Sequence, residues 1–153
     1  MHLHLWGTGD DLATFQDLAR ELGVEDRVHF NPKGFPLHEL PGQLRSMDLG
    51  VVGNRRSPAS DLMLPVKLME YVSLGIPVVV PRLKTIEYYF SDDMVAYYEP
   101  EDIQSMADSI DCLYRMPELR RRKVEQAGTF LREYGWERKG PELVGFYQEL
   151  LEK

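Results

Sequence analysis

The stretch LPVKLMEYVSLGIPVVV, Leu64–Val80, predicts a helix that leads directly into a buried strand. Pro65 suits the first helical position, where its missing N–H has no intrahelical partner to lose, and Gly75 is a typical helix stop. The strand Pro77–Val80 is apolar throughout, as expected where helices cover both faces of a parallel sheet. This order of elements favours an α/β fold.

Further strands and helices alternate on both sides of this stretch. Strands are expected at residues 2–6, 27–30, 48–52 and 94–98, and helices at 12–23, 37–47, 85–90 and from 101 onward, with breaks near 116–117 and 134–135. Such alternation indicates parallel pairing through right-handed crossovers. The prediction is an α/β fold, a doubly wound parallel sheet of Rossmann type with C-terminal helices, forming a single domain over residues 1–153.

The composition limits the partners and the compartment. The chain has 153 residues with 25 acidic and 18 basic side chains, a formal charge of −7, which argues against a nucleic-acid partner. The one cysteine, Cys112, fits a reducing compartment, and no apolar run is long enough to span a bilayer, so a cytoplasmic location is expected. The basic run at 119–123 is interpreted as a solvated helix face, with peripheral contact to anionic lipid as the alternative.

Lys67 and Glu70 lie three residues apart, on a different face of the predicted helix from its apolar stripe. In doubly wound sheets ligands bind beyond the carboxyl ends of the strands, where this helix begins. A helix N-terminus suits a phosphate, and Lys67 adds a positive charge there. The carboxylate of Glu70 can accept hydrogen bonds from both hydroxyls of a ribose. From helix geometry alone, a solvated Lys–Glu pair is the simpler interpretation.

Other polar patterns are less specific. The turn that begins at Gly7 lacks the third glycine of a dinucleotide fingerprint, so it either brings backbone near a ligand or simply joins a strand to a helix. Arg55 suits phosphate oxygens or is a solvated loop residue. His2 and His4 share one strand face, but two ligands are too few for a structural metal site, and no metal is expected.

The last predicted helix carries an apolar stripe at helical spacing. Its members are Leu143, Phe146, Tyr147, Leu150 and Leu151. The stripe is interpreted as facing a core, with packing on a partner chain as the alternative.

The opening stretch resembles the PxKLxEYxAxGxPVV segment of GT-B glycosyltransferases, specifically the large retaining group called family 4. The resemblance extends over almost the whole chain. LHLWGTGDDLATFQDLARELGVEDRVHF, GFPLHELPGQLRSMDLGVV, EPEDIQSMADSIDCLYRMPELRRR and YGWERKGPELVGFYQELL are similar to successive segments of the family. This ordered set outweighs the interpretation of Lys67 and Glu70 as a solvated pair.

The resemblance implies the donor-binding half of an enzyme that transfers a sugar from a nucleotide-diphosphate sugar to a glycan or cell-envelope precursor, with no metal or cofactor besides the donor. By the same resemblance, Glu70 matches the second glutamate of the Glu-x7-Glu motif, which binds the donor ribose, and Lys67 lies near the diphosphate. The first glutamate falls on Leu62, and the adjacent Asp61 is its candidate substitute. The other donor-site residues that the resemblance implies are Met63 and Leu64 through backbone N–H groups, and Gly34 and Phe35 beside the base. Gly7 and Arg55 join the candidate donor site on the residue patterns described above.

Compared with the family pattern, the chain is expected to lack the first strand of the donor domain and the whole N-terminal acceptor domain. The expected partners are a nucleotide-sugar donor and either an N-terminal-half chain or a second copy. The alternative functions are a non-catalytic nucleotide-sugar-binding module or half of a split enzyme that needs a partner chain. A flavodoxin-like regulatory domain ranks last, because no phospho-acceptor carboxylate cluster is evident.

Overall fold

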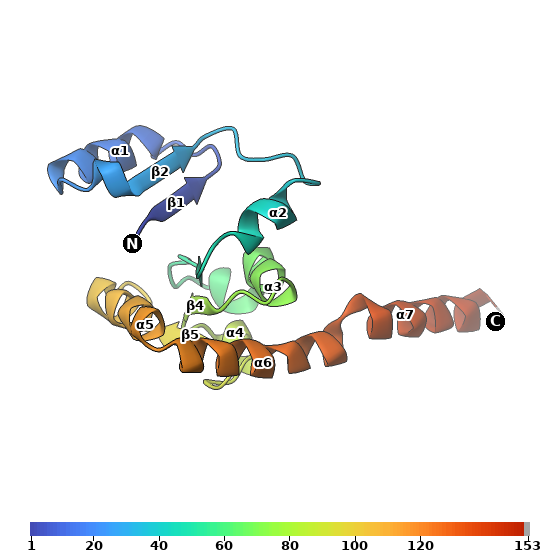
Figure 1. Cartoon of the computed structure of the whole chain (residues 1–153). Helices are drawn as coiled ribbons and strands as arrows, with labels where there is room; N and C mark the ends of the chain where they lie inside the picture. The colour runs from blue at the N-terminus through green and yellow to red at the C-terminus, as the bar shows by residue number, and fades with distance from the viewer. Residues whose placement is uncertain (152–153) are drawn as a thin grey trace. The chain divides into compact units, whose positions relative to one another are not determined.

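The computed structural model describes residues 1–151, and the chain divides into two compact units, Met1–Gln43 and Leu44–Lys153. Each unit carries its own parallel sheet (Figure 1). The predicted α/β fold with parallel strands and C-terminal helices is confirmed. The strands form two sheets rather than one, because β1 and β2 pair only with each other in the described part of the chain. The single domain over residues 1–153 stays a prediction.

The first unit is a strand–helix–strand unit with a thin core. Its elements are β1 (Leu3–Trp6), α1 (Leu12–Glu21), the 3-10 helix η1 (Glu25–Arg27) and β2 (Val28–Asn31). Asp11 occupies the N-cap position of α1 but makes no side-chain cap hydrogen bond, whereas Gly23 ends the helix with a φ of +63°, as expected. Among the residues described in this unit, Ala19 is the one buried apolar side chain.

The second unit holds a three-stranded sheet in the order β3-β4-β5 and most of the helices. Helix α2 (Leu40–Arg45) crosses from the first unit into the second. The elements that follow are β3 (Gly50–Val51), η2 (Ser60–Leu62), α3 (Val66–Ser73), β4 (Val78–Pro81), α4 (Lys84–Tyr89), β5 (Ala96–Tyr98), α5 (Ile103–Arg115), α6 (Pro117–Tyr134) and α7 (Trp136–Leu151). The predicted helix breaks are confirmed at Met116 and Gly135.

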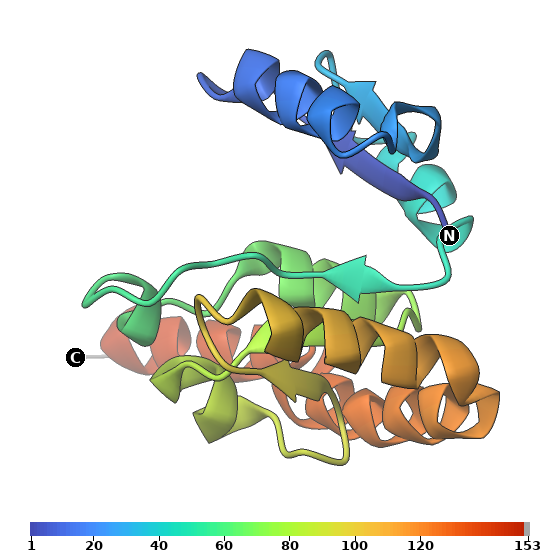
Figure 2. The ribbon, with the colours of Figure 1, turned by 90° about the vertical axis from the view of Figure 1, so that its left-hand side faces the viewer.

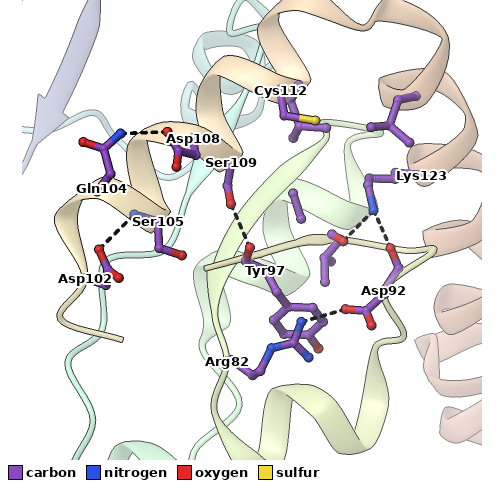
Figure 3. Close-up of a pocket in the computed structure, with 14 residues that line it drawn as sticks. Arg82, Asp92, Tyr97, Asp102, Gln104, Ser105, Asp108, Ser109, Cys112 and Lys123 are labelled. Carbon is purple, nitrogen blue, oxygen red and sulfur yellow. Dashed lines mark hydrogen bonds and ion pairs between the residues drawn. The ribbon is translucent and has the colours of Figure 1, made fainter. Parts of the chain in front are cut away.

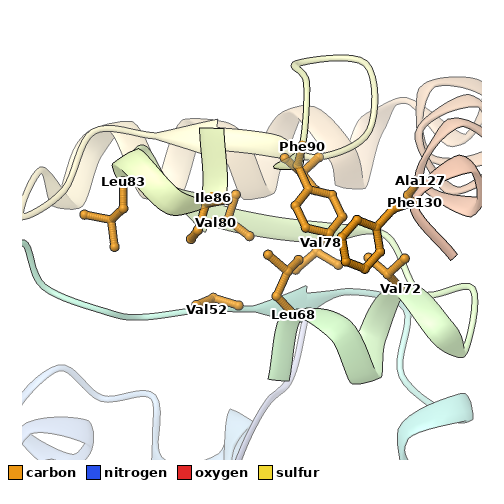
Figure 4. Close-up of a cluster of buried hydrophobic side chains, with 11 residues drawn as sticks. Val52, Leu68, Val72, Val78, Val80, Leu83, Ile86, Phe90, Ala127 and Phe130 are labelled. Atoms are coloured by element: carbon orange, nitrogen blue, oxygen red, sulfur yellow. The ribbon is translucent and has the colours of Figure 1, made fainter. Parts of the chain in front are cut away.

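Strand β4 lies at the centre of the core and is buried at all four positions. Val78 and Val80 belong to a cluster with side chains of α3, α4 and α6 (Figure 4). Val79 belongs to a second cluster with Leu113 of α5 on the other face. Figure 2 shows α5 running beside this sheet. Helices therefore cover both faces of the sheet, as the apolar run at Pro77–Val80 predicted.

Helix α3 is anchored by its predicted apolar stripe. Leu68 and Val72 are buried, and Gly75 ends the helix with a φ of +70° while the Ile76 N–H donates to the Tyr71 carbonyl. The ring of Tyr71 packs directly over Gly50 of β3, where a Cβ atom would overlap it. This close contact sets the distance between α3 and β3.

The prediction that the stripe of α7 faces a core is wrong for the described chain. Its members are 43–86% exposed: Leu143, Phe146, Tyr147, Leu150 and Leu151. The reason is that α7 packs on α6 and continues away from the sheet (Figure 1). Packing of the stripe on a partner chain stays a prediction. None of the described helices is both long and apolar enough to cross a membrane.

Candidate functional site

The N-terminus of α3 lies at the carboxyl edge of the β3-β4-β5 sheet, as the strand order requires. Pro65 is its N-cap residue, with a φ of −65° and no side-chain cap hydrogen bond. The Leu68 N–H donates to the Pro65 carbonyl at 3.0 Å. Because no side chain caps this end, the first N–H groups of the helix can donate to an anion.

Lys67 and Glu70 are placed as predicted, on the outward face of α3. The Lys67 side chain is exposed and Glu70 is half-buried, whereas Leu68 and Val72 of the same helix are buried. No ion pair joins Lys67 to Glu70 among residues 1–151. The pKa of Tyr71 is raised, mainly by burial and further by the negative charge of Glu70.

The loop after β3 is ordered by its own serines. Ser57 and Ser60 exchange hydrogen bonds: the Ser60 N–H donates to the Ser57 Oγ at 3.0 Å, and the Ser57 N–H donates to the Ser60 Oγ at 2.8 Å. The buried Ser60 hydroxyl also donates to the Arg55 carbonyl at 2.7 Å. Such mutual bonds form a rigid turn without help from a ligand.

Asp61 contacts the start of α4, and its contact with the donor sugar stays a prediction. Its side chain is only 17% exposed, and its carboxylate accepts from the Lys84 N–H at 3.4 Å and lies 4.0 Å from the Lys84 ammonium. The Thr85 hydroxyl donates to the Asp61 carbonyl at 2.7 Å. Asp61 thus holds the start of α4 by the favourable interaction of a carboxylate with a helix N-terminus.

The three residues after Asp61 differ in what they present. Leu62 and Met63 are exposed, whereas Leu64 is half-buried against the main core. The Met63 N–H already donates to the Ser60 carbonyl at 3.4 Å. The Leu64 N–H makes no hydrogen bond within the described residues, so it is the better placed of the two predicted donors.

Two neighbouring arginines have different environments. The guanidinium of Arg56 donates to the Arg82 carbonyl at 2.7 Å and so ties this loop to the end of β4. The Arg55 side chain is exposed, and no hydrogen bond or ion pair engages it in the described chain. Arg55 is therefore available to an anion at the same sheet edge.

Gly7, Gly34 and Phe35 lie together at the carboxyl edge of the β1-β2 sheet in the first unit. The N–H groups of Gly7 and Gly34 both donate to the Asn31 carbonyl, at 3.0 and 3.1 Å. Both glycines have positive φ, 128° and 62°, which side-chain-bearing residues rarely adopt. The ring of Phe35 contacts Trp6 edge-on, with 4.9 Å between centroids. Their contact with a base stays a prediction.

Arg82, at the end of β4, is the centre of a charged cluster. Its guanidinium lies 3.0 Å from Asp92, and its carbon lies 4.3 Å from the centre of the Tyr97 ring (Figure 3). The guanidinium also lies 3.0 Å from Glu87 and 3.4 Å from Glu99. The three carboxylates come from α4, from the turn before β5 and from the residue just after β5. The cluster ties together the segments that flank β5.

A cavity of about 560 Å³ lies beside β5 and α5, and a second of about 610 Å³ lies where Asp48 meets α6. Lys123, in the first, is 9% exposed and donates to the carbonyls of Asp92 and Val95 (Figure 3). Burial lowers the pKa of the Lys123 ammonium, whereas the negative charge of Asp92 raises it. Neither cavity is lined by Lys67 or Glu70, which lie on an open surface.

Comparison with known proteins identifies a family. The family described as "Glycosyl transferases group 1" matches residues 1–116. An uncharacterized glycosyltransferase of Haemophilus influenzae is 23% identical over 141 residues, which are 90% of this chain and 37% of that protein. The chain thus spans little more than a third of this relative.

Solved structures show the same fold. Sucrose-phosphate synthase from Thermosynechococcus elongatus matches 98% of this chain and 38% of its own, with a TM-score of 0.81 and 17% identity. HepE from Anabaena, in complex with UDP and glucose, matches 97% of this chain and 40% of its own, with a TM-score of 0.79 and 15% identity.

Proposed function

The chain belongs to the group 1 glycosyltransferases, and from this premise we propose that it binds the nucleotide-diphosphate sugar from which such an enzyme transfers a sugar. The proposed enzyme is of the retaining family 4 type and builds a glycan or polysaccharide precursor in the cytoplasm. Its proposed partners are the nucleotide-sugar donor and either an N-terminal-half chain or a second copy, and the proposal needs no cofactor besides the donor. Support comes from the family match and from HepE, a similar fold whose structure contains UDP and glucose.

The observation that carries the proposal is the open N-terminus of α3 with Lys67 and Glu70 beside it. The diphosphate accepts hydrogen bonds from the first N–H groups of the helix and is neutralised by the ammonium of Lys67. The carboxylate of Glu70, roughly one helical turn further along, accepts hydrogen bonds from the ribose hydroxyls. A nucleoside diphosphate therefore contacts both side chains at once.

The loop after β3 supplies the rest of the proposed donor site. The Leu64 N–H and the Arg55 guanidinium are the donors left for phosphate oxygens. Asp61 interacts with α4, so a direct contact between its carboxylate and the donor sugar is not part of the proposal. Leu62, at the position of the family's first glutamate, presents an exposed apolar side chain instead.

A second candidate is a nucleotide-sugar-binding module that catalyses transfer only with a partner chain. The chain spans 37% of its Haemophilus relative and 38% of sucrose-phosphate synthase. Transfer by the isolated chain would favour the complete enzyme. Transfer that begins only when an N-terminal-half protein is added would favour the divided one.

Calorimetric titration with UDP, GDP, ADP and inorganic pyrophosphate tests the site. Glu70→Ala should weaken binding of the preferred nucleotide by about 10- to 100-fold, because a hydrogen bond to a charged group contributes about 1.5–3 kcal/mol. Pyrophosphate has no ribose, so its binding should be unchanged by Glu70→Ala. Lys67→Ala should weaken the binding of both the nucleotide and pyrophosphate.

The matched control is Glu149→Ala, which removes an exposed glutamate from α7. It should leave both affinities unchanged. Wild-type affinity for all three nucleotides in Glu70→Ala would contradict the assignment of ribose to this carboxylate.

A further inference from the structure

Three histidines share one face of the small β1-β2 sheet. His4 of β1 is the parallel register partner of His29 of β2, and His2 lies two residues before His4 on the same face. The sequence pattern showed two of these imidazoles on one strand. Strand pairing adds the third, from a position 25 residues further along the chain than His4.

His2 and His29 face each other through ring nitrogens. Nδ1 of His2 lies 2.9 Å from Nε2 of His29, and the two rings are stacked with 5.1 Å between centroids and 17° between planes. The His4 ring lies 4.7 Å from that of His29. All three side chains are exposed, so ions in solution can reach them. Two imidazole nitrogens at this distance share one proton, which one nitrogen donates and the other accepts.

We propose that His2 and His29 together bind a divalent transition-metal ion, Cu²⁺ or Ni²⁺, in place of this shared proton. At a metal–nitrogen distance of about 2.05 Å, two ligands at 90° are about 2.9 Å apart, whereas tetrahedral ligands are about 3.3 Å apart. The observed separation therefore fits a tetragonal ion, and Cu²⁺ and Ni²⁺ prefer this geometry with nitrogen and oxygen ligands.

The protein supplies two ligands to this site and water supplies the others. Among residues 1–151 no group of three or more His, Cys, Asp or Glu side chains is arranged to hold a metal ion together. The proposed site is thus a surface chelate made by one histidine from each strand. It lies in the first unit and does not depend on the donor site proposed at α3.

Titration of the full chain with Ni²⁺ by calorimetry tests this site. His2→Ala and His29→Ala should each weaken Ni²⁺ binding at least about tenfold, because each removes one of the two imidazoles whose ring nitrogens face each other. His38→Ala is the matched control, since His38 is exposed and lies beside Glu39 rather than on this sheet face. It should leave the affinity unchanged.

The decisive variant is His29→Ala. His29 is the ligand that the second strand supplies, so a chelate formed by His2 without that strand does not need it. Ni²⁺ binding of wild-type strength in His29→Ala would therefore overturn the proposal. Circular dichroism of His29→Ala and of the polar variant His29→Gln establishes that the fold is retained, and the two variants should lose the same affinity.

Discussion

Single residues explain why the outward face of α3 is open while its inner face is closely packed. Lys67 and Glu70 were predicted from spacing and resemblance, and both lie on the outward face. Tyr71, which the spacing groups with them, instead packs its ring over Gly50. Helix periodicity cannot reveal this, because the space that receives the ring comes from a strand about twenty residues earlier.

The contact between Gly50 and Tyr71 leads to a prediction on stability. Gly50→Ala should lower the free energy of unfolding by about 1–3 kcal/mol, because the added methyl group overlaps the ring and forces α3 from β3. Urea unfolding followed by circular dichroism measures this change. Gly53→Ala is the matched control, since a Cβ atom there meets open space. Equal loss in both variants would contradict the steric explanation.

At the level of secondary structure elements, long-range polar contacts order the loop that precedes α3. Asp61 connects this loop to α4, and Arg56 connects it to the end of β4. Asp61 was predicted as a donor-sugar ligand because it is next to the position of the missing glutamate. Adjacency in sequence did not show that its carboxylate is directed at α4.

The contact between Asp61 and α4 gives the second stability prediction. Asp61→Ala should lower the free energy of unfolding by about 1 kcal/mol, the usual effect of losing a helix-capping carboxylate. Asp61→Asn keeps an oxygen acceptor, so its free energy of unfolding should fall by less. Leu62→Ala removes an adjacent side chain that is 82% exposed and should change stability by under about 0.5 kcal/mol. Chemical unfolding of the three variants under identical conditions measures these differences, and full stability in Asp61→Ala would exclude the capping role.

For the protein as a whole, stability resides mostly in the second unit, which holds nearly all the buried apolar side chains described. The stability of this unit depends on pH through Tyr71, Tyr97 and Tyr98. Burial raises the pKa of Tyr71, Tyr97 and Tyr98 above the ordinary value of 10.0. The hydroxyls of Tyr97 and Tyr98 donate to the carbonyls of Phe90 and Val52, so both must be protonated in the folded state.

The third stability prediction concerns alkaline pH. A raised folded-state pKa of a tyrosine means that its contribution is complete below the unfolded pKa of 10.0 and is lost as the pH rises above it. The lowered pKa of Lys123 acts in the opposite direction, but only up to its unfolded value of 10.5. The free energy of unfolding should therefore fall above about pH 10.5, by at most about 1.4 kcal/mol per pH unit for each tyrosine.

Urea unfolding between about pH 9 and pH 11 tests whether the free energy of unfolding falls as predicted. Tyr97→Phe should reduce the slope, because it removes a proton that the folded state retains more strongly than the unfolded chain. Tyr114→Phe removes a tyrosine that is 58% exposed and is the control. A slope that Tyr97→Phe leaves unchanged would contradict the assignment.

The type and order of the elements could be read from the amino-acid sequence because hydrophobic period, proline, glycine and apolar runs act over neighbouring residues. The helix over Val66–Ser73, its stop at Gly75 and the buried strand after it all follow from such local rules. Which distant segments of the chain contact one another does not follow from such local rules. The separation of the strands into two sheets, the contact of Asp61 with α4, the meeting of His2 with His29 and the exposure of α7 depend on which distant segments lie side by side. Only the folded packing settles these features, because each is a contact, or a missing contact, between residues that local periodicity does not connect.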